Sequence, residues 1–149
     1  MAEKFKYFVY SVCSLLVVLV LIQVIPYGRK YTNPPIIREP LWIDSATRAL
    51  AKRACFECHS NETIWPWYSR VAPISWLVRF DVDEGRRELN FSDWRSGARE
   101  GEHHDKIRRE IAEGSMPPAM FRLVHPEARL SDAEKRQLMD GLIATSIRR

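Results

Sequence analysis

The stretch Cys55-Phe56-Glu57-Cys58-His59 decides what fold to expect of this sequence. Two cysteines stand three positions apart, and a histidine directly follows the second one. On a helical turn, residues three apart lie on one face, so both thiols can meet one edge of a porphyrin while the imidazole reaches its iron. The pattern C-x-x-C-H is typical of c-type haem attachment. The sequence therefore predicts one covalent haem c, attached through Cys55 and Cys58, with His59 as an iron ligand.

Two other uses of these cysteines stay open. A zinc site would need a fourth ligand beyond the two thiolates and His59, and the candidates are His103, His104 and His125. A thioredoxin-type dithiol would need a βαβ context, and no convincing alternating strand is visible. The third cysteine, Cys13, lies in an N-terminal apolar run, so no disulfide framework is available. The chain must fold on its core or on a cofactor.

A second iron ligand is expected from the stretch Gly114-Ser115-Met116-Pro117-Pro118. Met116 is the candidate, because a thioether is a soft ligand that suits haem iron and Met/His ligation raises the reduction potential. Gly114 can end the preceding helix in a left-handed turn, and Pro117 disfavours the helical conformation at Met116. Met120 is the alternative thioether, and a histidine or an open position is the alternative to both.

Helical signals recur along the region that follows the apolar run. A first helix, capped by Asp44 or Ser45, is expected to end near Ala54, with Ala46, Leu50 and Ala54 at fourfold spacing. Because long loops separate this helix from the others, the sequence is easiest to understand if a large flat cofactor supplies part of the core.

Three more helices are expected after the C-x-x-C-H motif. One begins with a Ser75 cap and contains Gly85, a weak helix former. The next covers roughly 103–113, with Ile107 and Ile111 on one face. A capping box at 131–134 opens the last helix, whose expected apolar stripe consists of Leu138, Met139, Leu142, Ile143 and Ile147. These patterns predict an all-α fold.

The N-terminal segment predicts a membrane anchor. No charged residue lies between Tyr7 and Tyr27, and the apolar run Phe8–Ile25 has a length at the lower end of what a spanning helix needs. The run lacks the small-residue cleavage pattern of a signal peptide, although a cleaved signal stays the alternative. We expect an anchor over residues 1–27, an extended proline-containing linker over 28–43 and a haem domain over 44–149.

Orientation is set by the haem prediction, not by charge. Lys4 and Lys6 precede the apolar run and Arg29, Lys30 and Arg38 follow it, so the positive-inside rule slightly favours a cytoplasmic C-terminal region. Attachment of c-type haem takes place on the outer side of the bacterial inner membrane. We therefore expect a single-pass inner-membrane protein whose haem domain faces the periplasm.

Composition fits a globular chain. The 149 residues are 28% charged and 46% hydrophobic, with a formal net charge of +4. Acids are interspersed with the bases, so no nucleic-acid partner is expected. The aromatic residues Trp65, Trp67, Tyr68 and Trp76 are expected to pack against the haem edge or the core, or to donate to haem propionates.

The region from Asn33 to about Leu142 resembles the bacterial haem-binding domain family, small cytochrome c-like modules often carried behind an N-terminal membrane helix. The similar segments are TNPP, RACFECHSNETIWPWYS, APISWLV, EGRRELNFSDW, GSMPP and HPEARLSDAEK. The resemblance implies a cytochrome c-like fold with the first and last helices in contact, and haem ligation by Cys55, Cys58, His59 and Met116. Where such folds often place an aromatic residue in the last helix, this chain has Leu138 and Leu142.

Three functions are compatible with these signals. Electron transfer is favoured, because two protein ligands would saturate the iron and no distal acid–base group is evident. The expected partner is a redox protein, with membrane respiratory components as the class. A peroxidase-like enzyme would need an open or labile sixth position. A haem-based sensor or an assembly subunit is the third hypothesis.

Overall fold

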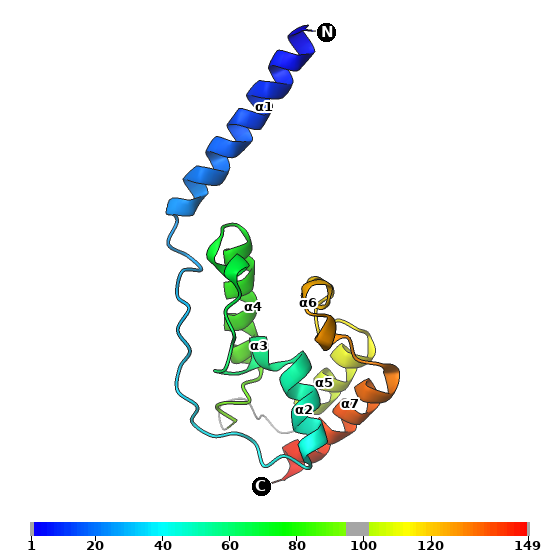
Figure 1. Cartoon of the computed structure of the whole chain (residues 1–149). Coiled ribbons are helices and arrows are strands. Elements are labelled where there is room, and N and C mark those ends of the chain that lie inside the picture. The colour runs from blue at the N-terminus through cyan, green and yellow to red at the C-terminus, as the bar shows by residue number, and fades with distance from the viewer. Residues whose placement is uncertain (1, 95–101, 149) are drawn as a thin grey trace. The chain divides into compact units, whose positions relative to one another are not determined.

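The computed structural model describes residues 2–94 and 102–148, and within them it is all-helical (Figure 1). No strand forms in these ranges, where the only β-type pairing is a single bridge between Arg38 and Asp93. The predicted all-α fold is thus confirmed. The elements are α1 (Ala2–Leu21), η1 (Ile22–Val24), α2 (Ser45–Ala54), α3 (Phe56–His59), η2 (Trp67–Arg70), α4 (Ile74–Glu88), α5 (Glu102–Ala112), α6 (Ala119–Val124), η3 (Pro126–Ala128) and α7 (Asp132–Ile147).

The chain divides into two compact units. The first contains Met1–Thr32 and Trp65–Asp81, and the second contains Asn33–Ile64 and Val82–Arg149. The division falls within α4, between Asp81 and Val82. The boundaries predicted from sequence, at 27/28 and 43/44, stay predictions.

In the first unit, α1 and η1 form an apolar rod whose side chains are almost all exposed. Residues Glu3–Val24 are long and apolar enough to cross a membrane. At 1.5 Å per residue, these 22 residues extend roughly 33 Å, close to the thickness of a bilayer core. Length and apolar character are what the sequence predicted for this segment.

In the second unit, α2 packs directly against α7, so the expected contact between the first and last helices of the domain is confirmed. Gly141 makes this contact possible. A Cβ atom built on it would lie 2.1 Å from Thr47 Oγ1 and 2.6 Å from Thr47 Cγ2. Leu138 and Leu142 lie on either side of Gly141 in the sequence and are both buried. The crossing therefore depends on Gly141 facing Thr47. Cytochrome c-like folds often place an aromatic side chain of the last helix at this contact.

Side-chain caps fix the first turns of α2 and α7. Asp44 Oδ1 accepts from the Thr47 amide at 2.6 Å at the start of α2, and Ser131 and Glu134 form the predicted capping box at the start of α7. Arg53 on α2 also forms an ion pair with Glu134. The Arg53 hydrogen bond, followed by those from Ser131, holds the pKa of Glu134 at about 2. The same carboxylate thus caps α7 and links it to α2.

Two details of the predicted apolar faces were wrong. On α2 the predicted Leu50 and Ala54 are buried, together with Thr47 and Ala51, whereas the predicted Ala46 is exposed. On α7 the buried positions are Leu138, Gly141, Leu142 and Thr145, whereas Ile147 is 68% exposed. The buried Thr47, Gly141 and Thr145 are small or polar residues, which a search for large apolar side chains passes over. Ser75 is also not a cap, because α4 already begins at Ile74.

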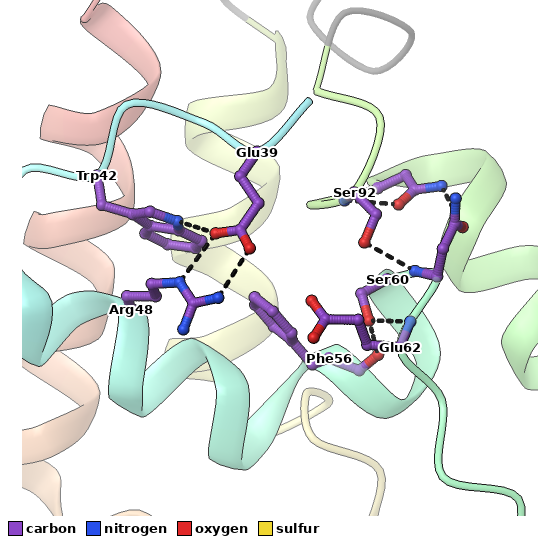
Figure 2. Close-up of polar contacts among 9 residues, drawn as sticks. Glu39, Trp42, Arg48, Phe56, Ser60, Glu62 and Ser92 are labelled. Atoms are coloured by element: carbon purple, nitrogen blue, oxygen red, sulfur yellow. Dashed lines mark hydrogen bonds and ion pairs between the residues drawn. The ribbon is translucent and has the colours of Figure 1, made fainter. Parts of the chain in front are cut away.

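The segment from Asn33 to Asp44 forms no helix, and it is bonded to other parts of the second unit. Its backbone pairs with residues 92–94, through Ile37 and Arg38 donating to Ser92 O at 2.8 and 3.1 Å. Figure 2 shows Glu39 of this segment accepting from Trp42 Nε1 at 2.9 Å and from Arg48 Nη2 at 2.7 Å. The ring of Trp42 then packs on the aromatic core described next.

Stacked aromatic rings form the centre of the second unit. Phe56 and Phe91 stack with ring centroids 5.2 Å apart, and Trp42 lies 5.3 Å from Phe91. Phe56 and Phe91 are 2% and 0% exposed. Since Phe56 is the residue that follows Cys55, the core and the C-x-x-C-H motif share one short helix. A change in the packing of these rings is therefore expected to shift the C-x-x-C-H motif.

Gly141→Ala tests the helix crossing. Alanine favours helix by about 1 kcal/mol over glycine, yet overpacking against Thr47 should lower the free energy of unfolding by about 1–3 kcal/mol. Denaturant titration of the full chain in detergent measures the change. Asp140→Ala, at an exposed neighbouring position, is the control and should have little effect. Equal or greater stability of Gly141→Ala would contradict the tight crossing, and Thr47→Ala should partly restore the stability that Gly141→Ala loses.

Candidate haem site

Residues 55–59 form a single helical turn at the end of α2. The Cys55 amide donates to Ala51 O at 2.8 Å and so continues α2, while Cys55 O accepts from the amides of Cys58 at 3.2 Å and His59 at 2.9 Å. The predicted turn is therefore present, with the two cysteines one turn apart along it. Both cysteines are half-buried.

Two hydrogen bonds fix His59 to the segment that follows α4. The Phe91 amide donates to His59 O at 2.8 Å, and His59 Nδ1 lies 3.1 Å from Leu89 O. Because a carbonyl can only accept, Nδ1 carries the proton and the lone pair is left on Nε2. Burial lowers the pKa of His59, which favours the neutral imidazole. A neutral imidazole with a bonded Nδ1 is the form in which histidine ligates metals.

A network of small polar side chains holds the chain immediately after the motif. Ser60 Oγ donates to Phe56 O at 2.7 Å and accepts from the Glu62 amide at 2.9 Å (Figure 2). The Asn61 amide donates to Ser92 Oγ at 2.9 Å. Sequence reasoning assigned no role to these residues, although their place directly after the motif and their full burial are a signal that they position it.

Gly85 brings α4 against the motif. A Cβ atom built on Gly85 would lie 2.5 Å from Cys58 O and 2.9 Å from Cys58 C, both backbone atoms. The helix continues through this position to Glu88. The glycine that weakened the helix prediction is therefore explained: it costs helix propensity but allows the close approach of α4 to Cys58.

The thiols are not arranged as a reactive dithiol. Burial, and next the neighbouring Cys58, raise the pKa of Cys55 to about 12, whereas cysteines that exchange disulfides have a lowered pKa. The zinc alternative gains no support either. The described side chains contain no group of three His, Cys, Asp or Glu that could hold a metal ion. The side chains of His103 and His104 lie outside the described residues, and His125 Nδ1 pairs with Glu127 at 2.9 Å.

A left-handed glycine and a hydrogen bond to α5 shape the backbone around Met116. Gly114 has φ +75°, the left-handed turn that the sequence predicted at the end of α5. The Met116 amide then donates to Glu110 O at 3.0 Å, and Pro117, joined to Met116 by a cis peptide bond, is buried. Met116 is 38% exposed and Met120, on α6, is 66% exposed. Ligation by Met116 stays a prediction.

The donors and the nearby apolar side chains fit a haem. His59 offers Nε2, and Cys55 and Cys58 offer two thiols one helical turn apart. The second unit also carries exposed apolar residues in the segments that follow the motif and the Met116 loop, which a flat apolar ring would cover; they are Ile64, Met120, Leu123 and Val124, each more than half exposed. In Figure 1, α3 continues from the upper end of α2, and α6 lies above α5 and α7.

Gly85→Ala tests how α4 supports the motif. The added methyl group cannot be accommodated next to Cys58 O unless α4 or the turn shifts, so we expect a lower melting temperature and less bound haem per chain. Calorimetry and the ratio of haem to protein absorbance measure these two effects. Glu84→Ala, on the same helix, is the matched control and should leave the haem content unchanged. Full haem content in Gly85→Ala would show that the close approach is not needed.

Comparisons with known proteins support a haem-binding domain. A family model described as a haem-binding domain matches residues 17–144, which cover most of the chain and include the Cys55–His59 turn and Met116. A search of curated proteins and a search of solved structures each found no match. The match extends from within the apolar helix almost to the end of α7, so it covers the whole haem site. The chain belongs to the haem-binding domain family.

Proposed function

We propose that this haem-binding protein is a membrane-anchored mono-haem c-type cytochrome that transfers electrons. The observation that carries the proposal is the Cys55–His59 turn, in which His59 Nδ1 is bonded to Leu89 O and Nε2 is available. Two thiols and one oriented imidazole on a single turn are what covalent haem attachment with proximal ligation requires.

Each residue of the turn has a separate part in the proposal. The thiols of Cys55 and Cys58 would each hold the haem through a thioether bond to one of its vinyl groups, an addition of S–H across the double bond that needs no external oxidant. His59 supplies Nε2, and Leu89 O holds its ring in position. When bound, the haem supplies an iron that takes up and releases one electron. The chain's own contribution is to hold the iron ligands in the same positions in both oxidation states.

Met116 completes the proposed ligand set. Its backbone is held between the left-handed turn at Gly114 and the buried Pro117, and its amide is bonded to Glu110 O. A loop that is already ordered loses little entropy when its sulfur binds. A permanently bound sixth ligand excludes substrates, which favours electron transfer over peroxidase or sensor chemistry.

The anchor and the location complete the proposal. The helix Glu3–Val24 has the length and apolar character of a single membrane span. We place it in the bacterial inner membrane with the haem domain in the periplasm, because covalent haem attachment requires that side. The partners would then be redox proteins of the membrane respiratory system.

Covalent attachment is tested with Cys55→Ala, Cys58→Ala and the double variant. Each single variant should retain less haem on a denaturing gel stained for haem peroxidase activity, and the double variant should retain none. Cys13→Ser is the matched control, because it removes a thiol that the proposal does not use. Undiminished staining of the double variant would contradict the c-type assignment.

The sixth ligand is tested with Met116→Leu, which keeps the side-chain volume and removes the sulfur. We expect a lower reduction potential, loss of the sulfur-to-iron charge-transfer band and rapid binding of carbon monoxide to the reduced protein. Met120→Leu is the control and should match the parent protein. If the parent already binds carbon monoxide rapidly, or if Met116→Leu has an unchanged spectrum, the iron has another ligand or an open position. The enzyme and sensor hypotheses would then replace electron transfer.

A further inference from the structure

The aromatic string 65–68 has a role that the haem site does not explain. Trp67 was expected to pack in the core or on the haem, yet it is 78% exposed. Its only ring contact among the described residues is an edge contact with Tyr68, at 5.9 Å between centroids. A tryptophan this exposed, at the start of η2, indicates a surface that contacts a membrane or another protein.

The end of the apolar helix is bonded directly to this loop. Gln23 Nε2 donates to Ala72 O at 2.9 Å, and the Ala72 amide donates to Gln23 Oε1 at 3.0 Å. Gln23 is the next-to-last residue of the span Glu3–Val24, whose roughly 33 Å is close to the about 30 Å of a bilayer core. If α1 spans the membrane, the loop is therefore held at the level where the helix leaves it.

The chain that follows the helix is also packed against α4. Gly28, with φ +78°, lies so close to Ser75 that a Cβ atom would come within 2.7 Å of Ser75 O. Arg79 Nη1 donates to Lys30 O at 3.0 Å. Because three separate contacts join residues 22–32 to residues 65–81, these two segments form one piece, which we call the juxtamembrane foot.

The charge of the foot suits an anionic surface. Its basic residues are Arg29, Lys30, Arg70 and Arg79, and its one acidic residue is Asp81. Arg29, Lys30 and Arg70 are exposed. The foot also carries exposed apolar side chains, which are Tyr27, Trp67, Val71 and Ile74. Aromatic and aliphatic groups mixed with cations are typical of segments that lie in the headgroup region.

We infer that the juxtamembrane foot is a second membrane contact, which inserts Trp67 at the bilayer surface and binds anionic phospholipid headgroups through Arg29, Lys30 and Arg70. This inference rests on the proposed span by α1 and adds a lipid-binding surface to it. It does not depend on which side of the membrane the foot occupies. A protein partner with an acidic surface is the competing occupant, and the bond from Gln23 favours lipid because it places the loop at the membrane.

The test is photocrosslinking from benzoylphenylalanine placed at Trp67 in the full-length chain. The protein is reconstituted into nanodiscs of equal parts phosphatidylglycerol and phosphatidylcholine, irradiated and analysed by intact-mass spectrometry. We expect a phospholipid adduct from position 67, with phosphatidylglycerol in excess over phosphatidylcholine. If this variant loses helix content, the probe at exposed Val71 replaces it. Arg29→Gln with Lys30→Gln should reduce the excess of phosphatidylglycerol adducts.

Two reference positions separate the inference from the anchor on which it rests. The same probe at Val17, within the span, should form lipid adducts, and at Gln137, an exposed position on α7, should give only background. Adducts at Val17 with only the Gln137 background at position 67 would overturn the foot and leave the anchor intact. Absence of adducts at Val17 would overturn both. Equal yields of the two phospholipids at position 67 would overturn the preference for anionic headgroups.

Discussion

The rest of the second unit depends on how His59 is held. Two bonds, from the Phe91 amide to His59 O and from His59 Nδ1 to Leu89 O, fix both the backbone and the ring of one residue to the segment after α4. The first bond places the turn, and the second selects the tautomer that leaves Nε2 available. Gly85 is needed for the same reason, since α4 must come close to Cys58 for the segment that follows it to reach His59.

Two packing contacts support the geometry of the turn at 55–59. Phe56, inside the motif, stacks on Phe91, so the aromatic core and the bond to His59 O involve the same short segments. The crossing of α2 and α7 at Gly141 then holds the helix from which the turn continues. This chain has few large buried side chains, and exposed apolar side chains follow both the motif and Met116, among them Ile64, Leu123 and Val124. A bound haem would complete this core.

Sequence reasoning predicted the parts whose cause is local. The turn at 55–59, the cap at Asp44, the capping box at Ser131 and the left-handed Gly114 each follow from residues within a few positions, and each is present. Gly141 and Gly85 were missed as packing residues, because the atoms they approach lie 94 and 27 positions away in the sequence, where no local pattern reports them. The bond from His59 to Leu89 was missed for the same reason. The pairing of Met116 with iron depends on a group that the chain must bind, so the sequence and the backbone leave it as a prediction.

Covalent attachment of haem to the turn at 55–59 can be tested by one measurement on the purified full-length protein. The protein is denatured in alkaline pyridine and reduced, and its absorption spectrum is recorded before and after extraction with acidified organic solvent. Covalent attachment predicts the band of a haem whose two vinyl groups are both saturated. It also predicts that the haem stays with the polypeptide after extraction. The band of a haem with intact vinyl groups, moving completely into the solvent, would contradict it.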